Sequence, residues 1–224
     1  MQVSTKLFNE QSIAQFNKQS ASIQDIQSKI ATGKNILNAS DDPTAASNLS
    51  FAKEQMTAIE KFKSNIEQAN TRMTMAENAL NEVSTVLTRI YELAIQGRND
   101  SYTVQDRASI AIEIGQLKET LVGLANTKDH KNDFLFSGFK VKTVPFNTNF
   151  DGSINYQGDR GVHSVQISET MKMNTSMDGG SVFLRVNTEN GRQSVFDIVS
   201  KIETDLLSGF VDVSSISEMN AAVD

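Results

Sequence analysis

The sequence predicts a mainly α-helical protein with a smaller β-rich unit, built as a long antiparallel helical bundle or coiled coil. Between residues 59 and 94, apolar residues recur at alternating steps of three and four, the heptad spacing of a long packed helix. After about residue 133 the pattern changes to short alternating runs between turn residues, which is typical of strands. These shifts divide the chain into segments 1–40, 41–133, 134–210 and 211–224: a first helix, a helical rod, a β-rich unit with a short helix, and the start of a truncated C-terminal helix.

The composition suits long helices and excludes several classes of function. Of the 224 residues, 38% are hydrophobic and only two are proline. A net charge of −6 argues against binding to nucleic acid or to an anionic membrane, both of which need a basic surface. The absence of cysteine excludes disulfides, thiolate zinc sites and cysteine nucleophiles. No apolar run approaches the roughly 20 residues of a membrane span, and the polar N-terminus is unlike a secretory signal peptide.

The first predicted helix runs from about Thr5 to Thr32, and Gly33 is a plausible stop. Its apolar stripe consists of Ile13, Phe16, Ile23 and Ile30. Ser20 and Gln27 occupy the intervening seam positions, so the stripe is too thin to stabilise the helix alone. We therefore expect these four apolar residues to contact another helix and to form an assembly interface.

The second predicted helix carries the heptad spacing. Asp42 is a capping carboxylate directly before Pro43 at the first helical position, and Asp41 adds a second acid near the positive end of the helix dipole. The helix should run to about Gln96 and end at Gly97. The predicted rod core consists of Ile59, Phe62, Ile66, Met73, Leu80, Val83, Leu87 and Ile90. We expect this seam to be the molecule's own core, packed against a third helix.

The remaining elements follow from local signals. Thr103 and Asp106 resemble a capping box that opens the third helix, and the short connection before it predicts antiparallel packing on the second. Strands are expected at 153–157, 162–167 and 181–186, and a helix at 195–207 that ends at Gly209. A further helix should begin near Ser215, and the sequence stops about two turns into it.

No pattern in the sequence predicts catalysis or a cofactor. Asp41 and Asp42 could form a catalytic or metal carboxylate pair, but helix capping explains both. His130 and His163 are the only histidines. Asp129, His130 and Asp133 could hold a metal, but no glycine loop or further array of ligands in the sequence supports such a site. We therefore expect a non-enzymatic protein with no cofactor and no metal.

Several short motifs, in order along some 160 residues, carry a resemblance to a known family. They are Val3-Ser4-Thr5, Ile30-Ala31-Thr32-Gly33-Lys34, Ser40-Asp41-Asp42-Pro43, Glu92-Leu93-Ala94-Ile95-Gln96, Leu124-Ala125-Asn126-Thr127, Phe134-Leu135-Phe136-Ser137-Gly138-Phe139 and Tyr156-Gln157-Gly158-Asp159. In their order and spacing the chain resembles the bacterial flagellins and, within them, the hook-associated proteins of the junction between hook and filament. The Asp-Asp-Pro and Leu-Phe-Ser-Gly stretches are more similar to the junction proteins than to filament flagellin.

The resemblance implies a structural subunit of the bacterial flagellum that joins the hook to the filament. Its terminal helices would form an inner, axial coiled-coil layer, in a helical homo-assembly that exists only in the flagellum. It implies the other flagellar axial proteins (a hook-side junction protein and flagellin) and an export chaperone as partners. The location would be extracellular, after export without a cleaved signal peptide.

One departure and two alternatives accompany the resemblance. Family chains normally end in a long helix that pairs with the first helix, and this helix is missing beyond about Asp224. We therefore expect the segment before Gly33 to lack its partner in the monomer. The alternatives are filament flagellin itself and, from another class, a secreted coiled-coil effector or adhesin.

Overall fold

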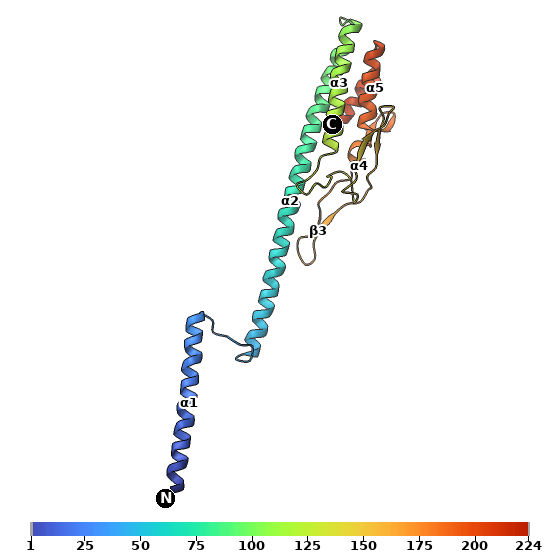
Figure 1. Ribbon diagram of the computed structural model, residues 1–224. Helices are drawn as coiled ribbons and strands as arrows, with labels where there is room; N and C mark the ends of the chain where they lie inside the picture. The colour runs from blue at the N-terminus through green and yellow to red at the C-terminus, as the bar shows by residue number, and fades with distance from the viewer. Residues whose placement is uncertain (1, 224) are drawn as a thin grey trace. The chain divides into compact units, whose positions relative to one another are not determined.

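The computed structural model describes residues 2–223, with side chains from residue 6 onward (Figure 1). Its contacts divide the chain into two compact units, Met1–Lys61 and Phe62–Asp224. These units differ from segments 1–40, 41–133, 134–210 and 211–224, which follow residue pattern rather than compactness. No helix within residues 2–223 is both long enough and apolar enough to cross a bilayer.

Two long helices account for the first part of the chain. Helix α1 spans Gln2–Thr32 and ends at Gly33, whose φ of +65° is the left-handed conformation that glycine adopts at helix ends. Helix α2 spans Pro43–Gly97. Its start is set by Asp42, whose Oδ1 accepts the backbone N–H of Ala45 at 3.0 Å. A proline as the first helical residue loses no hydrogen bond there, because that N–H has no partner within the helix.

Two further helices pack beside the second half of α2 (Figure 1). Helix α3 spans Val104–Ala125 and runs antiparallel to α2, and Thr103 and Asp106 form its complete capping box. Helix α5 spans Val195–Ser208 and ends at Gly209, with φ of +86°. Lys118 of α3 pairs with Glu203 of α5 at 2.7 Å, which fixes the two helices side by side.

The β-rich part consists of three separate antiparallel hairpins. They pair β1 (Phe146–Thr148) with β2 (Ile154–Tyr156), β3 (Ser164–Gln166) with β4 (Lys172–Asn174), and β5 (Val186–Thr188) with β6 (Gly191–Gln193). The register places Asn147 opposite Asn155, and Asn187 opposite Arg192. The predicted mainly α-helical fold with a small β part is thus confirmed.

One predicted strand is wrong. The sequence pattern predicts a strand at residues 181–186, but most of these residues lie in or beside the short helix α4 (Gly179–Phe183). The carboxylate of Asp178 accepts the N–H of Gly180 at 2.8 Å and so caps a helical turn. The helical turn buries Phe183, one of the apolar residues on which the strand prediction depends.

The core lies in the unit Phe62–Asp224, between α2, α3, α5 and the hairpins. Four buried aromatic rings pack against one another in this core, and the centroids of rings in contact are 5.2–5.9 Å apart. These rings are Phe136, Phe146, Phe183 and Phe196. Helix α6 (Val213–Val223) closes the core with Met219, which is fully buried. The rings therefore join the hairpins to α5 in one hydrophobic cluster.

Candidate assembly interface

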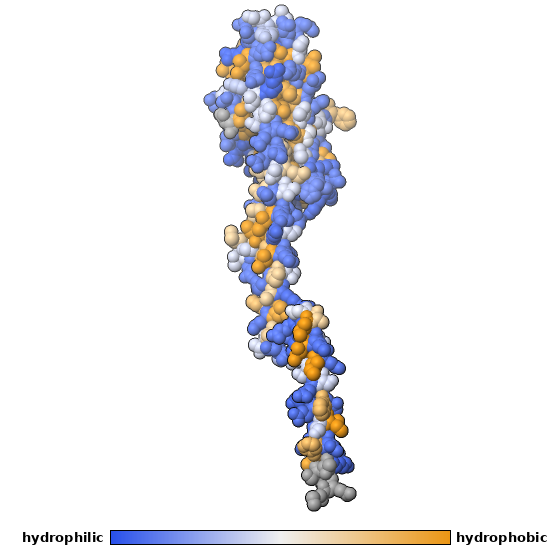
Figure 2. Space-filling view, turned by 90° about the vertical axis from the view of Figure 1, so that its left-hand side faces the viewer, coloured by the Kyte–Doolittle hydropathy of each residue, from blue (hydrophilic) through white to orange (hydrophobic). Residues whose placement is uncertain are grey.

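Helix α1 exposes the stripe that the sequence singled out. Its four residues are between 56% and 76% exposed, and in Figure 2 hydrophobic side chains reach the surface along this helix. They are Ile13, Phe16, Ile23 and Ile30. Their role in assembly stays a prediction, and their exposure is the property that such a role requires.

The two acids before α2 have different partners. Asp42 caps α2, whereas Asp41 accepts the N–H groups of Asn38 at 2.9 Å and Leu37 at 3.3 Å through one carboxylate oxygen. Asp41 therefore holds the turn of the connection before Pro43. Every polar bond of this pair stabilises local backbone, in line with capping rather than with a carboxylate pair for chemistry.

The α2 seam differs along its length from the expected continuous core. Val83, Leu87 and Ile90 are buried, and Phe62 and Leu80 are half-buried. The residues of the other part, Ile59, Ile66 and Met73, are 44–61% exposed and are not core in this chain. The reason is the difference in length. Because α2 has 55 residues and α3 has only 22, α3 can cover less than half of α2 and therefore only part of the seam.

An apolar cavity of about 600 Å³ lies where the covered and exposed parts of the seam meet. On the α2 side it is lined by the seam residues Met73 and Leu80 and by Ala76, which follows the same three–four spacing. Leu135 and Met177 line it from the hairpin side. The exposed seam thus continues into a hydrophobic groove.

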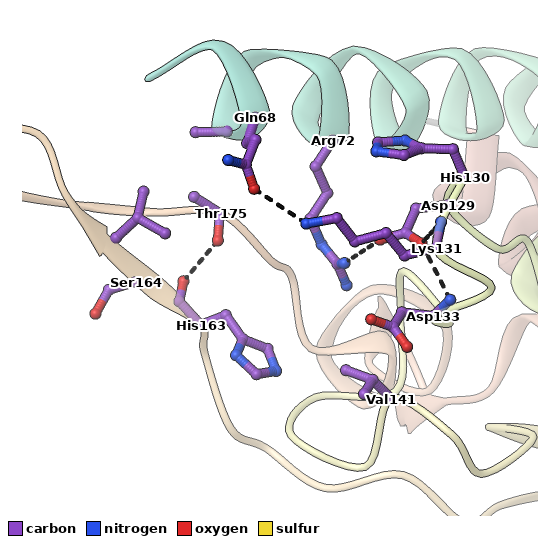
Figure 3. Close-up of a pocket in the computed structure, with 12 residues that line it drawn as sticks. Gln68, Arg72, Asp129, His130, Lys131, Asp133, Val141, His163, Ser164 and Thr175 are labelled. Atoms are coloured by element: carbon purple, nitrogen blue, oxygen red, sulfur yellow. Dashed lines mark hydrogen bonds and ion pairs between the residues drawn. The ribbon is translucent and has the colours of Figure 1, made fainter. Parts of the chain in front are cut away.

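A network of charges attaches the rod to the β-rich part (Figure 3). Arg72 of α2 donates to the Asp129 carboxylate at 2.6 Å and to the Phe134 carbonyl at 3.1 Å. The other oxygen of Asp129 accepts the N–H groups of Lys131 at 2.8 Å and Asp133 at 3.0 Å. No local sequence pattern predicts the Arg72–Asp129 pair, because its members are 57 positions apart and neither lies on the seam.

The same region contains Asp129, His130 and Asp133, the candidate metal ligands of the sequence. It encloses a cavity of about 220 Å³. In the view of Figure 3, His130 and His163 lie on opposite sides of Arg72 and Lys131. The ammonium of Lys142, 2.6 Å from Asp133, lowers the pKa of that carboxyl below its ordinary value. Among residues 2–223 no group of three or more acidic or histidine side chains is placed to hold a metal ion.

The two aromatic–glycine motifs of the sequence meet in one hydrogen-bonded turn. Oδ1 of Asp159 accepts the N–H groups of Phe139 at 2.7 Å and Gly161 at 2.8 Å. Gly138 has φ of +70°, and a side chain there would collide with Asp159. Burial, together with the nearby Asp178 carboxylate, raises the pKa of the Tyr156 hydroxyl to about 12. The motifs therefore shape a structural turn beside the core.

Comparison with known proteins identifies the family. The sequence profile of the bacterial flagellin N-terminal helical region matches residues 3–141, more than half of the chain. The chain belongs to this family. The flagellar hook-associated protein 3 of Salmonella typhimurium is 25% identical over 82% of this chain and 57% of its own length. A flagellin of Clostridium tyrobutyricum is 28% identical over 64% of this chain and 38% of its own length.

A solved structure shares the fold of this flagellin-family chain. It is that of a flagellar hook-associated protein described as putative from Vibrio parahaemolyticus, with 25% identity, a TM-score of 0.71, and coverage of 83% of this chain and 84% of that one. The chain spans about half the length of the curated relatives it matches. The function of those whole proteins is therefore transferred below only as a proposal.

Proposed function

We propose that this chain is a non-catalytic structural subunit of the bacterial flagellum that joins the hook to the filament. The similarity to hook-associated protein 3 supports this location, and family membership supports a structural role. In this proposal the chain carries out its role by packing against neighbouring subunits, without catalysing a reaction. Its long helices provide a rod, and its exposed apolar faces receive neighbouring helices.

The observation that carries the proposal is the exposure of heptad-spaced apolar residues on two helices. The α1 stripe and the seam residues Ile59, Ile66 and Met73 all follow the spacing that packs against another helix. Burying such a side chain contributes about 1–2 kcal/mol when more than half of it starts exposed. Contacts between unlike surfaces of successive subunits produce helical assemblies rather than closed oligomers.

The proposed partners are a hook-side junction protein, flagellin and an export chaperone. Export would proceed without a cleaved signal peptide, and the working location would be extracellular. A helix from a neighbouring subunit or from another axial protein would cover the α1 stripe. The chain would assemble with its own copies only within the flagellum.

The test introduces a charge into each exposed face in the native gene. We expect Phe16→Asp and Ile59→Asp to abolish filament attachment, so that flagellin accumulates in the medium and electron microscopy shows bare hooks. Asn17→Asp and Thr57→Asp are matched controls, since they add the same charge beside the stripe and the seam. Ile59 lies outside the N-terminal segment, so this variant separates assembly from export.

Normal filament numbers in both variants, with the altered protein present at the hook, would exclude these faces as assembly surfaces. The second candidate, filament flagellin, is favoured by the similarity to the Clostridium flagellin. Purified protein added to isolated hooks separates the two proposals. A junction protein adds a short layer and stops, whereas flagellin elongates into a filament.

A further inference from the structure

The turn between β5 and β6 contains a chemically labile dipeptide. Asn190 is the only asparagine in the sequence that is followed by glycine. Thr188 pairs with Gly191 across the turn, and Gly191 has φ of +104°. Asn190 and Gly191 are both exposed to water. Glycine has no side chain to hinder its own backbone nitrogen, so that nitrogen can reach the neighbouring side-chain carbonyl.

The side chain of Asn190 also holds a buried carboxylate. Its Nδ2 donates to Oε1 of Glu218 at 2.8 Å, and Glu218 on α6 is only 2% exposed. Gln193 donates to the same oxygen at 3.1 Å, and the Lys201 ammonium lies 2.9 Å from the other oxygen. Glu218 is therefore the point where α6, α5 and the β5–β6 hairpin meet.

We propose that Asn190 is a site of spontaneous deamidation, and that its conversion loosens α6 from the hairpin. The nitrogen of Gly191 bonds to Cγ of Asn190, the Cγ–Nδ2 bond breaks, and ammonia leaves with the proton from the glycine nitrogen. Water then opens the resulting succinimide at one of its two carbonyl carbons. Opening at Cγ gives aspartate, and opening at the main-chain carbonyl gives isoaspartate. The reaction needs only water and releases only ammonia.

Deamidation of Asn190 replaces an attractive interaction with Glu218 by a repulsive one. A donor at 2.8 Å is replaced by a second carboxylate, and among the residues that the structure describes Lys201 is the cation that pairs with Glu218. Two carboxylates at such a distance repel each other, and most strongly where one of them is buried. Isoaspartate also adds one backbone atom to a two-residue turn and shifts its register. Both products weaken the contact that fixes α6.

The first experiment ages the full chain in mildly alkaline buffer and maps the peptides by mass spectrometry. We expect the mass increase of deamidation, together with labelling by protein isoaspartate methyltransferase, at Asn190 well before Asn155 or Asn187. Asn190→Gln keeps an amide but reacts much more slowly, so it should remain unlabelled. Conversion at Asn190 no faster than at Asn155 or Asn187 would overturn the proposal.

The second experiment measures the structural effect with variants that separate charge from a lost hydrogen bond. We expect Asn190→Asp to lower Tm by about 4 °C and to speed amide exchange in α6, beyond the effect of Asn190→Ala. In a Glu218→Gln background the difference between these two variants should disappear. Asn187→Asp on the same hairpin is the matched control and should leave α6 protected. Equal effects of Asn190→Asp and Asn190→Ala would refute the repulsion.

Discussion

The Arg72–Asp129 pair offers the sharpest test of how the rod holds the β-rich part. Two arginines of α2 make similar ion pairs in different surroundings. Arg72 lies 2.6 Å from Asp129, and the side chains are 15% and 5% exposed. Arg89 lies 2.8 Å from Glu113, and both side chains are close to half exposed. The perturbation is Arg72→Met, which keeps the apolar stem, and Arg89→Met is its matched control.

The burial of each ion pair determines how much stability is lost when the pair is broken. Breaking a fully buried ion pair from one side costs about 3–5 kcal/mol, because the remaining charge is left uncompensated. Asp129 keeps two backbone N–H donors, so we expect Arg72→Met to cost about 3 kcal/mol, at the lower end. For a folded unit of this size that corresponds to a fall in Tm of roughly 6–12 °C. The exposed Arg89 pair should contribute little, since water screens it.

The assay is urea denaturation followed by circular dichroism, with amide exchange to locate the change. Arg72→Met should increase exchange in the segment that follows α3, while Arg89→Met should leave it unaltered. Adding Asp129→Asn to Arg72→Met removes the uncompensated charge and should restore part of the stability. Equal effects of Arg72→Met and Arg89→Met, or no recovery in the double variant, would refute the reasoning.

Two further predictions concern the seam and the turn. Ile90→Ala should lower the free energy of unfolding by about 2–5 kcal/mol because Ile90 is fully buried, whereas Ile59→Ala, at an exposed position, should change it little. Urea titration measures both free energies, and similar losses would mean that the first half of the seam is packed in solution. The raised pKa of Tyr156, to about 12, means that its contribution to stability is complete below pH 10 and is lost as the pH rises toward 12. Absorbance titration should show an ionisation near pH 12 that Tyr156→Phe removes, and the absence of this ionisation would contradict the burial of the hydroxyl beside Asp178.

The helix ends were predicted most accurately from the sequence, because they depend on residues that lie close together in the chain. The start of α2 at Pro43, the capping box of Thr103 and Asp106, and the end of α5 at Gly209 all follow from hydrogen bonds within four residues. Such bonds depend on residue types that stand side by side in the chain. No knowledge of the remaining fold is needed to foresee them.

Burial and side-chain contacts were predicted less well where residues far apart in the chain pack against each other. The heptad spacing of Ile59 and Ile66 is the same as that of Leu87 and Ile90, and only the length and placement of α3 separate exposed from buried members. The pair of Arg72 with Asp129 spans 57 positions and leaves no local signal. Glu218 is a similar case, because the partners that compensate its burial, Asn190 and Lys201, lie on other elements of the fold.

The uneven covering of α2 gives one continuous helix two different thermodynamic regimes. Its Gly97 end is stabilised by tertiary packing, and its Pro43 end rests mainly on backbone hydrogen bonds and helix propensity. Amide protection should therefore decline from one end to the other. Whatever binds the exposed half must also restrict its conformational freedom, so part of the binding enthalpy is offset by lost entropy. Association would then appear in calorimetry with a larger negative heat-capacity change than the contact area alone produces.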